Sequence, residues 1–276
     1  MKKDKPIIVT VSGGFDPIHI GHKKKLIIFD LDGTLTESKA VIDQKMSALL
    51  CQLLKKKKVA VIGGGSWEQF KKQFLANFKC ESAQLKNLFI FPTSGSAFYR
   101  HKNNKWIKVY QLSLNLKEIE KIMSAFRAAF RELHYKHPFK THGKIIENRG
   151  SQITFSALGQ KAPVEKKQQW RDTADMRLEI KAILERYLPN FETRLGGLTS
   201  IDVTRKGIDK GYGIRQISKF LGISKNDMIF AGDALYEGGN DYAVKRAGVA
   251  TIEVKDAEET KIFIRSMLSS LNNEQN

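Results

Sequence analysis

Cysteine is scarce in this 276-residue sequence, which contains only Cys51 and Cys80. Two cysteines are too few for a disulfide framework or for a zinc site built from cysteine ligands, so both of these classes are excluded. The two residues are also not spaced as a C-x-x-C pair. We therefore expect both to be buried free thiols.

The sequence also lacks an apolar run near the roughly 18–20 residues that are needed to cross a bilayer. Its basic start leads into a short apolar stretch, residues 7–11, without the cleavage pattern of a signal peptide. We therefore expect a cytoplasmic protein without a membrane partner. With 41% hydrophobic residues, the composition excludes disorder as the main state of the chain.

Acidic residues are in deficit, because 29 Asp and Glu residues stand against 47 Lys and Arg residues. The resulting formal net charge of +18 favours anionic partners, which could be nucleic acid, an acidic membrane surface or phosphorylated metabolites. The lysine runs at residues 23–25 and 55–58 lack the interleaved aromatic residues of a base-stacking surface. We interpret these runs as solvated surface.

Three short apolar runs end in small or acidic residues, which is typical of parallel strands that are buried on both faces. They are residues 26–29 before Asp30, residues 59–62 before Gly63, and residues 228–231 before Gly232. Apolar residues at helical spacing lie between and after these runs. The alternation predicts an α/β fold, with a Rossmann-like core of three layers whose ligands gather at the carboxyl ends of its parallel strands.

The middle of the chain has a different pattern, in which strands follow one another without helices between them. A helical pattern over residues 119–133 precedes strand candidates at 144–148 and 152–158, a helix at 172–187, and strand candidates at 191–195 and 200–204. This block predicts a small α+β cap inserted into the core. The predicted division is an N-terminal arm of residues 1–25, a core of residues 26–110 and 205–276, and a cap of residues 111–204.

The stretch Phe-Asp-Leu-Asp-Gly-Thr-Leu-Thr at residues 29–36 carries the most specific chemistry. Asp30 and Asp32 at the end of a buried strand repel each other unless a cation neutralises them, and Mg²⁺ takes such oxygen ligands together with substrate phosphate. Asp30 can attack phosphorus and form an aspartyl phosphate. Asp32 can protonate the leaving oxygen and later activate an incoming hydroxyl group. Gly33 allows the sharp turn that brings backbone amides toward the phosphoryl group.

This pattern resembles the first motif of the haloacid dehalogenase superfamily of phosphotransferases. Other motifs similar to those of the superfamily follow in order, at Gly65 and Ser66, at Lys210, at Asp233, and at Asn240 and Asp241. The resemblance implies that Ser66 and Lys210 hold the transferring phosphoryl group. It also implies an Mg²⁺ site formed by Asp30, the main-chain oxygen of Asp32 and Asp233, supported by Asn240 and Asp241. Ser66 is also suited to cap the helix that follows it.

Within the superfamily the sequence is most similar to the phosphomannomutases and their relatives with an α/β cap, the subfamily known as IIB. Arg149, Ser200 and Asp202 fall on the positions of cap residues that hold the sugar and the distal phosphate in that family. Where the family's phosphate-gripping arginines align, this sequence has Lys39, His142, Gln160 and Lys167. Several positions therefore lack the bidentate guanidinium fork that suits phosphate.

A mutase must hold both ends of a bisphosphate, whereas a phosphatase needs one phosphate site and access for water. We therefore expect first an Mg²⁺-dependent phosphatase that hydrolyses a phosphorylated sugar, and second a phosphomannomutase. A nucleotidyltransferase and a nucleic-acid-binding protein on an inactive core are minor alternatives. The resemblance also implies a homodimer that pairs through the cap.

Residues 13–22, Gly-Gly-Phe-Asp-Pro-Ile-His-Ile-Gly-His, closely resemble the first motif of the cytidylyltransferase-like nucleotidyltransferases. In that family His19 and His22 would stabilise charge on a nucleotide α-phosphate. Only three lysines separate the motif from the strand that leads to Asp30, so the helix and crossover of that fold have no room. The hypotheses are a fusion remnant or ordered arm, a working half-site, and an arm that brings one of the two histidines to the phosphatase site.

Overall fold

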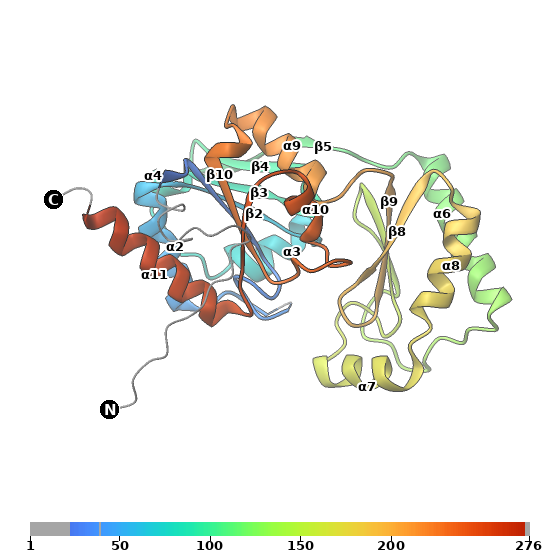
Figure 1. Ribbon diagram of the computed structural model, residues 1–276. Coiled ribbons are helices and arrows are strands. Elements are labelled where there is room, and N and C mark those ends of the chain that lie inside the picture. The colour runs from blue at the N-terminus through green and yellow to red at the C-terminus, as the bar shows by residue number, and fades with distance from the viewer. Residues whose placement is uncertain (1–22, 39, 274–276) are drawn as a thin grey trace. The chain divides into compact units, whose positions relative to one another are not determined.

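The computed structural model describes residues 23–38 and 40–273 (Figure 1). The chain divides into two compact units, with boundaries between Tyr110 and Gln111 and between Ile208 and Asp209. We call the unit that contains Asp30 the core and the unit between these boundaries the cap. The nucleotidyltransferase-like motif with His19 and His22, as well as Lys39, lies outside the described residues.

A seven-stranded sheet forms the middle of the core. Its strands, in spatial order, are β11 (Ala250–Glu253), β10 (Met228–Gly232), β1 (Leu26–Asp30), β2 (Lys58–Ile62), β3 (Leu88–Phe91), β4 (Ala97–Lys102) and β5 (Lys105–Gln111). The five strands from β11 to β3 are parallel, and β4 pairs with β3 in the antiparallel direction. The prediction of an α/β fold with a largely parallel sheet is confirmed. The antiparallel extension through β4 and β5 was not predicted.

Alternate residues of β1 point to opposite faces of the sheet, and each face has its own apolar core. Ile27 and Phe29 pack with apolar residues of α2 and α11, whereas Leu26 and Ile28 pack with those of α9 and α10. The helices of the core are α2 (Gln44–Lys56), α3 (Trp67–Phe70), the π-helical turn η1 (Lys71–Leu75), α4 (Ser82–Leu85), α5 (Pro92–Gly95), α9 (Lys210–Leu221), η2 (Lys225–Asp227), α10 (Tyr242–Arg246) and α11 (Ala257–Asn273). The core therefore has three layers (Figure 1).

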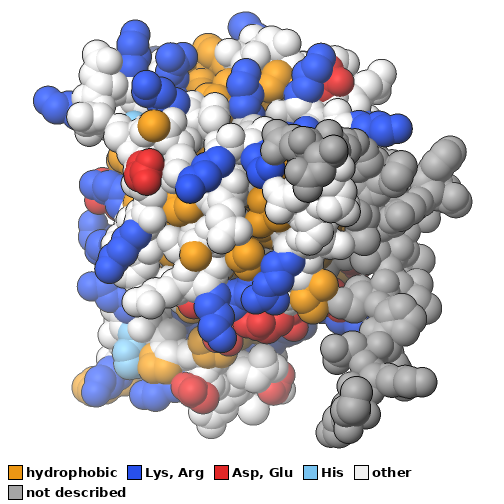
Figure 2. All heavy atoms as spheres, turned by 90° about the vertical axis from the view of Figure 1, so that its left-hand side faces the viewer, with side chains coloured by type: hydrophobic (Ala, Val, Ile, Leu, Met, Phe, Trp, Pro, Cys, Tyr) orange, Lys and Arg blue, Asp and Glu red, His pale blue; other side chains and the backbone are white. Residues whose placement is uncertain are grey.

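Lysine and arginine side chains are scattered over the described part of the surface that Figure 2 shows, and apolar and acidic side chains lie between them. A nucleic-acid-binding face would gather its basic residues into a patch or stripe.

None of the described helices is both long enough and apolar enough to span a bilayer.

The cap is a four-stranded antiparallel sheet with helices on one face. Its strands, in spatial order, are β6 (Ile146–Asn148), β7 (Gln152–Ser156), β9 (Ser200–Arg205) and β8 (Phe191–Gly196), and its helices are α6 (Leu116–Glu132), α7 (Val164–Ala174) and α8 (Arg177–Tyr187). Phe155 and Ile201 lie opposite each other and pack with Phe126 of α6 and Ile180 of α8. Because side chains alternate along a strand, the other face of this sheet carries the polar residues of β7 and β9.

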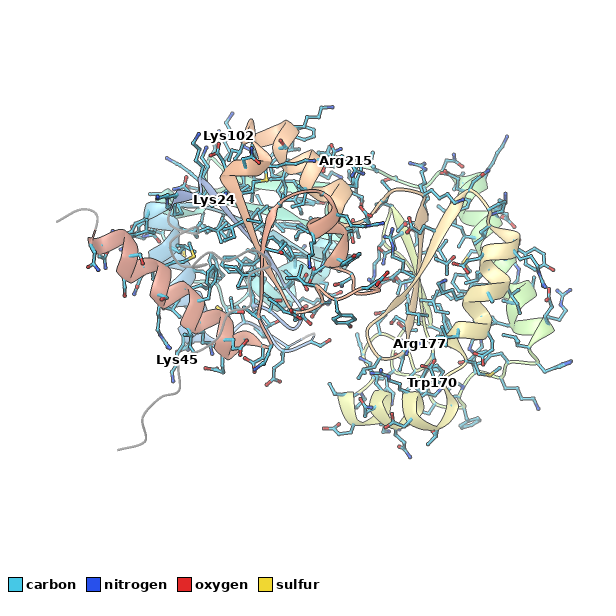
Figure 3. The ribbon with its side chains drawn as sticks, in the orientation of Figure 1. Lys24, Lys45, Lys102, Trp170, Arg177 and Arg215 are labelled. Carbon is cyan, nitrogen blue, oxygen red and sulfur yellow. A yellow bond between two sulfur atoms is a disulfide. The ribbon has the colours of Figure 1, made fainter. Side chains whose placement is uncertain are left out.

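The predicted helix at residues 172–187 is confirmed from Arg177 to Tyr187, but its predicted start is wrong, because two helices meet within that range. α7 ends at Ala174 and α8 begins at Arg177. The carboxylate of Asp175 accepts hydrogen bonds from the backbone N–H of Arg177 at 3.0 Å and from its guanidinium group. Arg177, labelled in Figure 3, also donates to the carbonyl oxygen of Gly197 at 2.8 Å. The new helix start is therefore tied to the turn between β8 and β9.

The prediction of buried free thiols is also wrong, since Cys51 of α2 and Cys80 form a disulfide with their Cα atoms 5.5 Å apart. The bond ties α2 to the segment between η1 and α4. The backbone N–H of Lys79 reinforces this link by donating to Ser47 Oγ of α2 at 3.2 Å. The two cysteines are 29 positions apart in the sequence, so their proximity depends on the packing of the helices and had no local signal.

Candidate active site

Asp30 and Asp233 lie at the carboxyl ends of two neighbouring parallel strands. Asp30 is the last residue of β1, and Asp233 directly follows β10. Phe29 lies opposite Ala231 in this parallel pair, so the two aspartates leave the sheet side by side. One carboxylate oxygen from each of Asp30, Asp233 and Asp241 lies within 4.8 Å of the others. The structure thus brings together three of the aspartates that the sequence predicted for the site.

Lys210 is the buried cation of this cluster. Its Nζ lies 2.7 Å from Asp30 Oδ1 and 2.5 Å from Asp241 Oδ1, and it donates to Asn240 Oδ1 at 3.3 Å. The side chains of Asp30, Lys210 and Asp241 are all buried. Lys210 is the first residue of α9, whose N-terminus is capped by Asp209 through the backbone N–H of Tyr212 at 2.7 Å.

The pKa values of this cluster reflect its burial and its excess of carboxylates. Burial raises the pKa of Asp30 well above its ordinary value; Asp241 and Asp233 add to this effect, and Lys210 opposes it. Burial likewise raises the pKa of Asp233. Burial alone would lower the pKa of Lys210, but the carboxylates of Asp241 and Asp30 raise it, so this lysine remains protonated. One ammonium group stands against three carboxylates, which leaves negative charge to be neutralised.

The donor set of the cluster fits Mg²⁺, which prefers oxygen ligands. Both carboxylate oxygens of Asp241 are already engaged. Its Oδ1 forms the ion pair with Lys210, and its Oδ2 accepts the backbone N–H of Ala234 at 3.1 Å, so Asp241 holds Lys210 and the start of the loop after β10 in place. Asp30 and Asp233 are then the carboxylates suited to the metal. Gly33, at φ +83°, lies directly against Asp233, because a Cβ on it would be 2.4 Å from Asp233 Oδ2. Only glycine leaves room for this carboxylate.

Two residues that support the aspartates were missed by the sequence analysis. Thr34 Oγ1 donates to Asp233 Oδ1 at 3.1 Å, and Gln73 Nε2 donates to Asp32 Oδ1 at 2.7 Å. Thr34 is part of the aspartate motif and could have been considered with it. The signal of Gln73 was weaker, because it is one of several polar residues between Trp67 and Phe78 and lies in no recognised motif.

Ser66 and Gly65 lie in the loop after β2, the neighbour of β1 on the side opposite β10. Ser66 Oγ accepts the backbone N–H of Gln69 at 3.3 Å, so its expected role as the cap of α3 is present. The carbonyl oxygen of Gly65 accepts the backbone N–H of Thr93 at 2.9 Å, which ties this loop to the one after β3. The loop thereby shares the edge of the sheet from which Asp30 projects.

Within the cap, Arg149, Ser200 and Asp202 belong to one hydrogen-bonded polar face. Arg149 donates from Nε to Glu147 Oε2 at 2.8 Å and from a terminal nitrogen to Gln160 Oε1 at 3.0 Å. The side-chain amide of Gln160 in turn donates to Ser156 Oγ at 2.7 Å, which lies 2.7 Å from Ser200 Oγ. A second bond joins Thr154 Oγ1 to Asp202 Oδ1 at 2.7 Å. We call this set the cap polar face: Glu147, Arg149, Thr154, Ser156, Gln160, Ser200 and Asp202.

A parallel α/β sheet with an Asp-x-Asp pair at one strand end, a serine loop at the next and a buried lysine–aspartate cluster beside them defines an enzyme of the haloacid dehalogenase type. The family described as eukaryotic phosphomannomutase matches residues 46–270. The chain belongs to the eukaryotic phosphomannomutase family. The sequence-based recognition of both the superfamily and its phosphomannomutase branch is confirmed.

Two curated relatives and one solved structure illustrate the similarity. A phosphomannomutase of Encephalitozoon cuniculi (strain GB-M1) is 28% identical over 257 residues, covering 86% of this chain and 91% of the relative. Phosphomannomutase 2 of Dictyostelium discoideum is 26% identical over 229 residues, covering 81% of this chain and 87% of the relative. The structure of Plasmodium falciparum IMP-nucleotidase superimposes with a TM-score of 0.69 at 17% identity, covering 94% of this chain and 72% of that one. This last likeness concerns the fold alone.

Proposed function

We propose that this enzyme is a mutase, which moves a phosphoryl group between two positions of a hexose phosphate through an aspartyl phosphate on Asp30. The observation that carries the proposal is the family match, which runs through the cap as well as through most of the core. In this family the cap holds the sugar and the distal phosphate. Arg149, Ser200 and Asp202 lie at the matching positions and share the cap polar face. This favours the mutase over the phosphatase that the sequence analysis placed first.

In the first step a carboxylate oxygen of Asp30 attacks one phosphorus of a hexose bisphosphate, the bond between that phosphorus and the sugar oxygen breaks, and the oxygen takes a proton from Asp32, which leaves a hexose monophosphate. Lys210, 2.7 Å from Asp30 Oδ1, holds positive charge beside the incoming phosphoryl group. The loop of Gly65 and Ser66 contributes a backbone N–H and a hydroxyl group. Mg²⁺ held by Asp30, the main-chain oxygen of Asp32 and Asp233 would supply positive charge that offsets the carboxylates and the phosphate.

In the second step Asp32 accepts the proton of a hydroxyl group on a hexose monophosphate, and that oxygen attacks the phosphorus on Asp30. The bond between phosphorus and Asp30 breaks, which releases a hexose bisphosphate and restores the free carboxylate. The bisphosphate must then reverse its ends, so the cap must bind whichever phosphate is distal to Asp30. Arg149 is suited to this, because Glu147 and Gln160 hold its guanidinium group in a fixed orientation.

A phosphatase is the second candidate, and Gln160 is the observation that favours it. This neutral amide stands where an arginine of the family aligns, so the cap polar face carries less positive charge for a distal phosphate. A weaker distal site would allow water to replace the sugar hydroxyl as acceptor. The products of hydrolysis would then be inorganic phosphate and the free sugar.

The two candidates are separated by their products from mannose 1-phosphate and Mg²⁺, with and without a hexose 1,6-bisphosphate. The mutase predicts hexose 6-phosphate, formed faster when the bisphosphate is present, with little release of inorganic phosphate. Phosphate release without the isomer would identify the phosphatase. A wild-type protein whose turnover equals that of Asp30→Asn would contradict both candidates.

A further inference from the structure

Gln73 links the turn η1 to the carboxyl group of Asp32. The buried amide of Gln73 donates from Nε2 to Asp32 Oδ1 at 2.7 Å and to Thr36 Oγ1 at 2.8 Å. We infer that Gln73 is a positioning residue that fixes the Asp32 carboxyl group for proton transfer. This inference rests on the proposed function, in which Asp32 gives a proton to one sugar oxygen and takes it from another.

The orientation of the Gln73 amide is set by its partners. Thr36 Oγ1 donates to the carbonyl oxygen of Leu31 at 3.4 Å, which leaves it to accept from the NH₂ group of Gln73. At the other end, Gln73 Oε1 accepts Gln69 Nε2 at 3.1 Å. A flipped amide would place its carbonyl oxygen against a carboxylate, so this arrangement admits one orientation.

The backbone of Gln73 is also held, and it lies within the π-helical turn η1. The N–H of Ala76 bonds to the carbonyl oxygen of Lys71 at 2.9 Å, the wider spacing of a π turn. The carbonyl oxygen of Gln73 accepts the N–H of Ile42 at 2.8 Å, from the segment that joins the aspartate motif to α2. Gln73 is thus anchored through both its main chain and its side chain, and π turns of this kind recur at functional sites.

Proton transfer needs a defined orientation of the carboxyl group, because the proton must point along the line to the reacting oxygen. A carboxyl group rotates about its Cβ–Cγ bond, and a hydrogen bond to Oδ1 restricts this rotation. A neutral amide can bind the carboxyl oxygen in both protonation states of Asp32, whereas a cation would favour the ionised state. Glutamine therefore suits a residue that must both donate and accept.

The test uses two substrates that differ in their need for a proton. When hexose 1,6-bisphosphate gives a phosphoryl group to Asp30, the leaving sugar oxygen departs as an alkoxide unless it is protonated, whereas p-nitrophenyl phosphate releases a phenolate that is stable without a proton. Gln73→Met keeps an unbranched side chain of similar length and removes the amide. We expect the rate of phosphoryl transfer from hexose 1,6-bisphosphate to Asp30 to fall about 10- to 100-fold, part of the typical contribution of general acid–base catalysis. The rate with p-nitrophenyl phosphate should change by less than about 3-fold.

The matched control is Gln84→Met, which makes the same substitution at a buried glutamine of α4 in the same unit. It should leave both rates unchanged, and thermal melting of each variant checks that it folds. If Gln73→Met does not fold, Gln73→Asn retains the amide but shortens its reach, and the same difference between substrates is expected. Equal losses with both substrates, or no loss with either, would overturn the inference. A folded wild type that uses neither substrate would instead overturn the proposed function, and the inference with it.

Discussion

At the scale of single residues, the site depends on a buried lysine that two carboxylates share. Asp30→Asn removes the nucleophile, so we expect phosphoryl transfer to fall at least about 10³-fold. The fold should persist, because Lys210 keeps Asp241 as an ion-pair partner at 2.5 Å. Steady-state turnover and far-ultraviolet circular dichroism measure the two effects, and substantial residual turnover would refute the role of Asp30.

A second residue, Gln160, is neutral, so the cap polar face carries less positive charge than it would with an arginine at this position. The resemblance drawn from the sequence implies an arginine of the family at this position, so we expect Gln160→Arg to raise the ratio of hexose 6-phosphate to inorganic phosphate about tenfold, a gain of ~1.4 kcal/mol in distal phosphate binding. The control is Gln168→Arg, which adds the same charge on the exposed side of α7. An equal rise in both variants would mean that general electrostatic attraction, and not the position of Gln160, sets the ratio.

At the scale of elements, an ion pair between Glu118 and Arg205 joins the first turn of helix α6 to strand β9 within the cap. Arg205 of β9 donates to both carboxylate oxygens of Glu118, at 2.7 and 2.6 Å, and Glu118 also accepts the backbone N–H of Asn115 in a capping box. The hydrogen bonds from Arg205 are the main reason that the pKa of Glu118 falls to about 2. Glu118 therefore stabilises the cap above its ordinary pKa of 4.5, and this contribution is lost as the pH falls toward 2.

We expect Glu118→Gln to lower the free energy of unfolding by about 1 kcal/mol at pH 7, because both the pair and the cap are weakened. The difference from the wild type should shrink as the pH falls from 4.5 toward 2, because Glu118 becomes protonated in the unfolded protein first and in the folded protein only around and below pH 2. Urea unfolding at several pH values measures this difference in the free energy of unfolding. Glu120→Gln, on the exposed side of the same helix, is the control, and a difference that does not depend on pH would contradict the assigned cause.

The elements that could be predicted from sequence are those with a local pattern. Residues 26–29, 59–62 and 228–231 are continuous apolar runs, and they match β1, β2 and β10 closely. The short strand β11 has no such run, and the break between α7 and α8 lies at Asp175, whose carboxylate accepts the backbone N–H of Arg177. Patterns of hydrophobicity do not carry that information.

The site shows the same limit. Asp30, Lys210 and Asp241 could be recognised because each sits in a dense motif, and the structure joins them within hydrogen-bonding distance. Gln73 could not, because its partner Asp32 lies 41 positions away in the sequence. The bond between Gln160 and Ser156 spans only four positions, but it depends on the turn that follows β7, in which the backbone N–H of Gly159 donates to the carbonyl oxygen of Ser156.

At the scale of the whole molecule, the disulfide closes a loop of 29 positions in the core. In the chain-entropy model a loop of this size stabilises the folded state by roughly 3–4 kcal/mol, because the unfolded chain loses conformations. Replacing both Cys51 and Cys80 by serine should therefore lower the melting temperature by roughly 5–15 °C. Reductant should lower the melting temperature of the wild type and leave the double variant unchanged. Equal melting with and without reductant would contradict a stabilising bond.

The position of the cap in the chain also determines the order in which the molecule can be completed during synthesis. The pairing of β1 with β10 sets Leu26 opposite Met228, and the chain between them includes the entire cap. While the ribosome is still making residues 111–208, β1 has one neighbour, β2, and its other edge waits for β10. The cap is continuous in sequence, so its own contacts can form before that edge is covered. The contact between Lys210 and Asp30 can therefore form only after the cap has been synthesised, which makes the catalytic cluster one of the last parts of the protein to assemble.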